Sequence, residues 1–171
     1  MVEKSARQRI VHWDDPKALM KAGQTLSGRD FLEAWRKGEL PPPPICQLLD
    51  FTLEEVDDGR AALVIEPHES QYNPMGSVHG GIAATMLDSA MGLAVCSKCT
   101  AGRTFTTLEI KVNYLRAMSI ETGPVRAIGR VIHFGRQIAM AEASLVDSSG
   151  KLYAQASSTV LLVDIPPKRT E

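Results

Sequence analysis

A charge-poor stretch in the middle of the chain constrains the fold most. Between Glu69 and Lys98, Asp88 is the only Asp, Glu, Lys or Arg. From about His79 to Cys96 the segment is apolar on every side at helical spacing, which predicts a buried helix surrounded by other elements. A carboxylate in such a helix is costly without partners, and burial raises its pKa. Because perturbed carboxylates gather at functional sites, Asp88 is a candidate functional group.

Two glycines at the expected start of this helix add a second candidate. A helix that begins at Gly80 and Gly81 points unpaired backbone N–H groups outward at the positive end of its dipole. Such groups can hold a carbonyl oxygen as it gains negative charge. Asp88 lies seven residues after Gly81, about two turns further, so it falls on roughly the same side of the helix. We therefore expect one short segment to hold both a backbone donor for the carbonyl oxygen of a substrate and a base or nucleophile.

Most of the other regular structure is predicted to be β. Residues 104–116 alternate in polarity. One predicted face has Leu108, Ile110, Val112 and Tyr114, and the other has Thr107, Glu109, Lys111 and Asn113. A hairpin is predicted over 51–66, and strands over 125–134, 137–146 and 151–163. One long buried helix among five antiparallel strands predicts an α+β domain in which the sheet wraps the helix.

The first 44 residues differ from the remainder. Residues 14–37 are weakly helical in pattern, with Ser27 as a predicted N-cap and Gly38 as a predicted stop. The run of prolines at 41–44 predicts a stiff connector. We expect residues 1–44 to form a helical arm and proline connector that packs on the core or on a neighbouring subunit. Residues 45–165 form the main domain and residues 166–171 a tail.

Composition limits the function classes. The chain has 171 residues, 44% of them hydrophobic, and a formal net charge of −1. These values suit one globular domain and do not favour nucleic-acid binding. The N-terminus is charged and lacks an apolar signal core, and no stretch approaches the length of a membrane span. We expect a cytoplasmic protein with no membrane or nucleic-acid partner.

The chain has three cysteines, and this odd number argues against a disulfide framework. Cys96 and Cys99 make a lone CxxC, which is typical of a redox pair or half of a zinc site. The sequence has no second cysteine pair and no His-x-x-x-His. We therefore interpret Cys96 and Cys99 as two small residues at a helix end. We predict no metal and no cofactor.

One set of motifs resembles a known family. Asn73, Gly76, the triplet 79–81 and Asp88, followed by 106–109 and 113–116, resemble the hotdog-fold thioesterases of the phenylacetate-pathway (PaaI-like) type. The similarity covers about residues 45–163. It implies a hotdog fold, in which a sheet wraps a central helix, and hydrolysis of an acyl-CoA to free acid and CoA. It also implies homodimers or homotetramers with active sites at subunit interfaces.

The resemblance also implies roles for individual residues. Asp88 corresponds to the catalytic carboxylate, a general base or nucleophile, and the Gly80 N–H to the donor that binds the thioester carbonyl. Asn73 and His79 correspond to residues that line the site, and Thr107 to a hydroxyl that orients water. The candidates for substrate binding are Gly81, Met75, Arg116 and Arg136, the two arginines because the CoA phosphates need cations. The acyl group stays open between aromatic and medium-chain.

Other functions remain as alternatives. A non-catalytic acyl-CoA-binding protein could use the same fold, and so could a hydratase or dehydratase. The hydratase usually has Asp and His paired on a loop and a helix, which this sequence does not show. A serine or cysteine triad is disfavoured, because the sequence has no GxSxG elbow and no cysteine beside a histidine partner.

Overall fold

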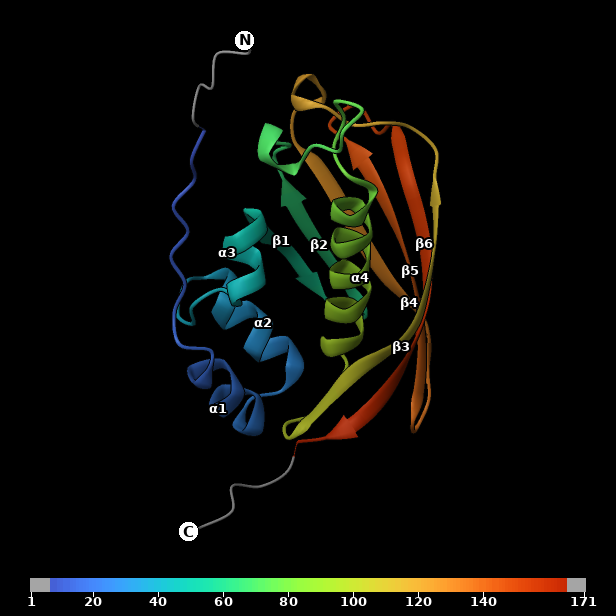
Figure 1. Cartoon of the computed structure of the whole chain (residues 1–171). Coiled ribbons are helices and arrows are strands. Elements are labelled where there is room, and N and C mark those ends of the chain that lie inside the picture. The colour runs from blue at the N-terminus through green and yellow to red at the C-terminus, as the bar shows by residue number, and fades with distance from the viewer. Residues whose placement is uncertain (1–6, 166–171) are drawn as a thin grey trace.

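The computed structural model describes residues 7–165, which form an antiparallel sheet wrapped around one long helix, as expected (Figure 1). The predicted tail at 166–171 lies outside the described residues. The helices are α1 (Lys17–Thr25), α2 (Gly28–Arg36), α3 (Pro44–Leu49) and α4 (Gly80–Cys96), with 3-10 turns η1 (Glu69–Gln71) and η2 (Ile120–Thr122). The strands are β1 (Phe51–Asp57), β2 (Arg60–Ile65), β3 (Arg103–Tyr114), β4 (Val125–Phe134), β5 (Ile138–Asp147) and β6 (Leu152–Asp164).

The sheet has the order β1-β2-β4-β5-β6-β3, and every neighbouring pair is antiparallel. It contains six strands, which are the two arms of the predicted hairpin and the four later predicted strands, so the expected count of five was one too low. Gly59 allows the tight turn between β1 and β2 with a φ of 74°. The strands β1 and β3 are the two edges. None of the helices in residues 7–165 has the length and apolar character needed to cross a membrane.

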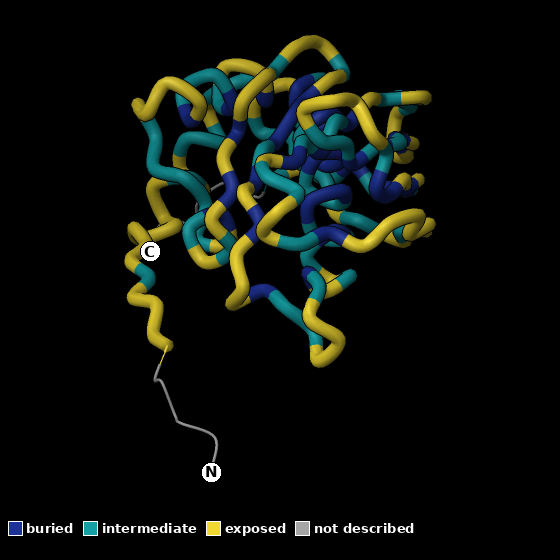
Figure 2. The backbone as a smooth tube through the Cα atoms, turned by 90° about the horizontal axis from the view of Figure 1, so that it is seen from above, coloured by how far each residue is buried: buried dark blue, intermediate teal, exposed yellow. Residues whose placement is uncertain are grey.

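Helix α4 lies close against the concave face of the sheet. Met86, Leu87, Ala90 and Met91 of α4 are fully buried, and Figure 2 shows the buried residues concentrated in the middle of the molecule. The approach is closest at Gly129 of β4, where an added Cβ would lie 2.2 Å from the carbonyl oxygen of Ala90. Only glycine leaves room for the helix backbone at this point.

The C-terminal end of α4 is held by two other elements. The Ser97 hydroxyl accepts the Gly59 N–H at 2.8 Å, which ties the β1–β2 turn to the helix. Gly28, the first residue of α2, donates its N–H to the Cys99 carbonyl at 2.9 Å. A Cβ on Gly28 would lie 1.7 Å from the Cys96 carbonyl oxygen, so α2 and α4 meet there without any side chain between them.

Strand β3 corrects the predicted alternation. The pairing with β6 shifts between Thr107 and Glu109, so Leu108 forms a β-bulge. Thr107 therefore shares the helix-facing side with Ile110 and Val112, which pack against the core, instead of the opposite side as predicted. Leu108 is 55% exposed and does not join that face. One extra residue on the strand changes which side chains meet α4.

The arm, defined as residues 7–44, packs on the core as expected. In α2, Leu32 is fully buried and Trp35 is 7% exposed. Ser27 caps this helix by accepting the Asp30 N–H, as predicted, and Gly38 follows its end with a φ of 77°. Arg9 pairs with Asp50 at 3.4 Å, so the extended segment before α1 also contacts the main domain (Figure 1).

Replacing Leu32 by Ala tests how strongly the arm is bound. Because the Leu32 side chain is fully buried, we expect the free energy of unfolding to fall by about 2–5 kcal/mol. Leu48→Ala is the matched control, since Leu48 is 51% exposed and its loss should change stability by no more than about 0.5 kcal/mol. Urea denaturation measures both. Equal, small effects in the two variants would show that the arm docks weakly.

Candidate active site

A short loop ahead of α4 is organised by Asn73. The Asn73 Oδ1 accepts the N–H of Met75 at 2.9 Å and of Ser77 at 3.3 Å, and its Nδ2 donates to the Ser77 hydroxyl at 3.1 Å. Its backbone N–H donates to the Ser77 carbonyl. The side chain of Asn73 is therefore engaged inside its own loop, which it shapes for the start of the helix.

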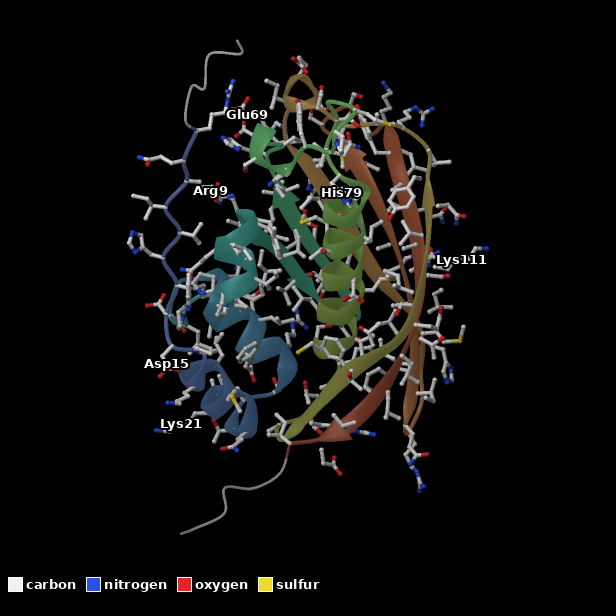
Figure 3. All side chains as sticks on the ribbon, in the orientation of Figure 1. Arg9, Asp15, Lys21, Glu69, His79 and Lys111 are labelled. Carbon is white, nitrogen blue, oxygen red and sulfur yellow. The ribbon has the colours of Figure 1, made fainter. Side chains whose placement is uncertain are left out.

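His79 is the N-cap of α4 and stands at the upper end of the helix (Figure 3). Its Nδ1 accepts the Gly81 N–H at 2.8 Å, which places the proton of the neutral ring on Nε2. The His79 carbonyl accepts the Ile82 N–H. The Gly80 N–H has no acceptor among residues 7–165. The first turn thus leaves one donor available at the positive end of the helix dipole.

Asp88 has one hydrogen-bond partner among residues 7–165. The Thr107 hydroxyl donates to the Asp88 Oδ1 at 3.0 Å, across from α4 to β3. Asp88 is half-buried in the chain rather than enclosed as the sequence predicts, because a cavity opens beside it. The cavity measures about 190 Å³ and is otherwise mostly apolar. Its lining residues are Trp35, Pro43, Ile45, Cys46, Phe51, Asp88, Ser89, Leu93 and Phe105.

The two candidate groups, the Gly80 N–H and the Asp88 carboxylate, lie far apart along α4. Gly80 precedes Asp88 by eight residues on α4, about 12 Å along the axis at 1.5 Å per residue. An oxyanion donor and a base each act over about 3 Å. A single copy of the helix therefore does not bring the Gly80 N–H and the Asp88 carboxylate to one carbonyl, although both lie on the same segment.

The predicted substrate-binding residues occupy both ends of α4. Gly81 and Met75 are exposed near its start, with Met75 83% exposed. Arg116 lies near the same end and donates to the Leu152 carbonyl. Arg136 lies in the β4–β5 turn at the other end, where its carbonyl accepts a hydrogen bond from Arg103. One chain alone does not gather these four residues.

Two further residues at the site were not predicted from the sequence as site residues. Trp35 of the arm and Phe105 of β3 line the Asp88 cavity. A Cβ on Gly92 of α4 would lie 2.5 Å from the Phe105 ring, so that ring rests directly on the helix. The only sequence signal for this wall is the spacing of Phe31 and Trp35, which are four residues apart and therefore lie on one face of a helix.

The cysteines are free and buried or half-buried. Burial raises the pKa of the Cys46 and Cys96 thiols to about 12 and raises that of Cys99 as well. The Cys99 thiol contacts the Val95 carbonyl at 3.6 Å. Within residues 7–165, no three His, Cys, Asp or Glu side chains gather in a way that could hold a metal ion.

Several known proteins are similar to this chain in sequence and in fold. The sequence profile of the thioesterase superfamily matches residues 75–154. A candidate esterase of Halobacterium salinarum is 36% identical over 107 residues, which cover 60% of this chain and 69% of that protein. The 1,4-dihydroxy-2-naphthoyl-CoA hydrolase of Listeria monocytogenes is 25% identical over 114 residues, 67% of this chain and 91% of that protein.

A solved structure agrees with these matches. The crystal structure of a candidate thioesterase related to phenylacetic acid degradation, from Ralstonia eutropha, superposes with a TM-score of 0.69. It is 26% identical and covers 76% of this chain and 98% of its own. The fold and the matches define a hotdog-fold thioester hydrolase. The chain belongs to the thioesterase superfamily, and its likeness to the phenylacetate-pathway type is confirmed.

Thiol labelling tests the environment of the CxxC pair. Thiolates are the reactive form, and a thiol whose pKa is about 12 is only about 10⁻⁴ thiolate at pH 8. We expect native protein to react with Ellman's reagent far more slowly than unfolded protein, in which all three thiols titrate together. Rapid reaction of the native protein, or a disulfide between Cys96 and Cys99 after mild oxidation, would contradict a purely structural pair.

Proposed function

We propose that the protein hydrolyses the thioester of a small aromatic or medium-chain acyl-CoA, giving the free acid and CoA. The observation that best supports this is the position of Asp88 at an apolar cavity, with the Thr107 hydroxyl bound to one carboxylate oxygen. When the acyl group is bound in this cavity, its thioester carbonyl lies next to the Asp88 carboxylate. A relative named for naphthoyl-CoA hydrolysis supports a CoA thioester as the substrate class.

The reaction needs a nucleophile and an oxyanion donor. Asp88 acts as a general base that takes a proton from water, or as a nucleophile that forms a mixed anhydride with the acyl group. In either route the carbonyl oxygen gains negative charge, and the Gly80 N–H donates to it. The tetrahedral intermediate then collapses, the C–S bond breaks, and the CoA thiolate leaves and takes up a proton. In the general-base route this step gives the free acid directly, whereas in the nucleophilic route water then hydrolyses the anhydride, which releases the acid and restores the Asp88 carboxylate.

The separation along α4 supports a site shared between two copies of the chain. A carbonyl within reach of Asp88 needs its oxyanion donor from elsewhere, because Gly80 of the same helix is about 12 Å away along the axis. A second copy with its α4 antiparallel would supply the start of that helix. We therefore place the Gly80 N–H of one copy opposite the Asp88 of the other.

Strand β3 offers the edge for such pairing. It has 12 residues, and within the described part of the chain it pairs with β6 on one side only. A long free edge is a template for another strand. Pairing of β3 with β3 of a second copy about a two-fold axis runs antiparallel and sets the two α4 helices antiparallel as well. The homodimer, or a tetramer of two such dimers, is the assembly that this arrangement favours.

The remaining residues act around these two groups. Thr107 positions the Asp88 carboxylate and the attacking water. His79 and Asn73 shape the helix start that presents Gly80. CoA contacts Arg116 and also Met75 and Gly81, which are exposed beside the helix start. Arg136 of a second copy supplies a further cation for the CoA phosphates. Lys111 of β3 points away from α4 and is not included (Figure 3).

Asp88→Asn tests the proposed reaction. The amide keeps the size and an acceptor for Thr107 but cannot take a proton or attack. We expect kcat to fall by about 10²–10⁴-fold, with the thermal unfolding midpoint changed little. Free thiol release is measured with phenylacetyl-, hydroxybenzoyl- and medium-chain acyl-CoA. Asp58→Asn, an exposed carboxylate in the β1–β2 turn, is the control and should retain full activity.

Mixed oligomers test whether the site is shared. Gly80→Pro removes the N–H at a helix position that tolerates proline, whereas Gly80→Ala keeps the N–H and is its steric control. We expect Gly80→Pro to lower kcat by about 10²–10³-fold and Gly80→Ala to lower it much less. Subunits of Gly80→Pro and Asp88→Asn, refolded together in equal amounts, should recover about a quarter of wild-type activity, because half of random dimers contain one intact site. No recovery in verified mixed dimers would place both groups in one chain.

A further inference from the structure

A second apolar cavity lies between the arm, the end of α4 and the start of β3. It measures about 360 Å³. Its lining residues are Leu19, Met20, Gly23, Gln24, Leu26, Gly28, Phe31, Cys96, Arg103, Thr104 and Ile165. Most of these side chains are apolar, and Arg103 is the charged side chain among them. The walls come from α1, α2, the end of α4, the start of β3 and the residue that follows β6.

The two cavities have no lining residue in common, but neighbouring residues of the same three elements, α2, α4 and β3, line both. On α2, Trp35 lines the first cavity and Phe31, one turn away, lines the second. On α4, Leu93 and Cys96 have the same relationship. One turn of helix is about 5.4 Å, so the cavities are neighbours along a single cleft between α2, α4 and β3.

Phe105 stands between the two cavities. It lines the first, and the adjacent Thr104 lines the second. The Phe105 ring sits in the space that a Cβ on Gly92 would need, at 2.5 Å from that position. On α4, Gly92 is four residues after Asp88, which lines the first cavity, and four residues before Cys96, which lines the second. The ring is therefore seated on the helix backbone at the boundary and closes the inner end of the Asp88 cavity.

We infer that the two cavities form one acyl-binding cleft and that Phe105 is the divider that sets acyl length. This inference rests on the proposed thioesterase function and adds the part of the substrate that the arm recognises. The Asp88 cavity of about 190 Å³ is close to the roughly 150 Å³ of an engineered apolar cavity that binds benzene. It therefore takes one aromatic ring or a chain of about six carbons.

The second cavity fits the distal part of a longer acyl chain. Leu19, Met20 and Phe31 of the arm offer an apolar surface with no carboxylate among the lining residues. Phe105 keeps such a chain out in the wild-type protein. Removing the ring joins the cavities, so a longer chain that starts at Asp88 reaches the α1–α2 wall. The arm thus contributes to acyl selection as well as to stability.

Phe105→Ala tests the divider. The probes are S-alkyl-CoA thioethers with butyl, hexyl, octyl and dodecyl chains, which bind without turnover and are measured by calorimetry on the intact oligomer. In the wild type, affinity should rise with length to hexyl and then level off. In Phe105→Ala, the ratio of dodecyl to hexyl affinity should rise by about 10-fold or more, the scale on which pockets discriminate apolar groups.

Two further variants separate the divider from a general loss of packing. Phe134→Ala removes a half-buried aromatic side chain that lines neither cavity, and it should leave the length profile unchanged. Phe31→Trp in the Phe105→Ala background refills the second cavity and should cancel the gain for dodecyl. If Phe105→Ala folds poorly, Phe105→Leu should give a smaller shift in the same direction.

The outcomes distinguish this inference from the proposed function. An unchanged length profile in folded Phe105→Ala or Phe105→Leu overturns the divider, even if acyl-CoA hydrolysis depends on Asp88. The expected shift in thioether binding supports the divider even if no acyl-CoA is turned over, in which case the proposed reaction is wrong and the cleft is a binding site. Equal shifts in Phe134→Ala would also overturn it.

Discussion

The contact of α4 with the sheet at Gly129 is the constraint on which the other features depend. Because β4 has no side chain there, the Ala90 carbonyl takes the space that a Cβ would fill. This sets the height of the helix above the sheet and therefore which side of the helix faces away from it. Asp88, two residues earlier, is turned toward the edge strand β3 and the arm instead of toward the middle of the sheet.

The seating of α4 also separates the polar groups of the site. The His79 ring and the Gly80 N–H are at one end of the helix, while Asp88 and Thr107 are near its middle. Apolar residues buried against the sheet hold the helix rigidly, so neither group can move toward the other. In the proposed mechanism a carbonyl bound beside Asp88 takes its oxyanion donor from a second chain, which makes assembly part of that mechanism.

The sequence predicts some of these features well and others not at all. The charge-free run around Asp88 predicted α4 to within one residue, because a segment so apolar has no alternative to burial. Ser27 and Gly38 predicted both ends of α2, since caps act locally. The bulge at Leu108 was missed, because the alternation of polar and apolar residues along one strand does not show how that strand pairs with its neighbour. The wall formed by Trp35 and Phe105 was missed for the same reason, since these residues are 70 positions apart.

The bulge makes the number of residues in β3 as important as their identity. On one side of Leu108 the strand presents Thr107 to Asp88, and on the other it presents Ile110 and Val112 to the core. A serine at 107 would keep the hydroxyl, and many apolar residues would serve at 110 or 112. Deleting one residue between them would turn one half of the strand over and remove either the polar partner or the packing. Surface loops of this chain can vary in length as it evolves, whereas this stretch of strand can accept substitutions but not insertions or deletions.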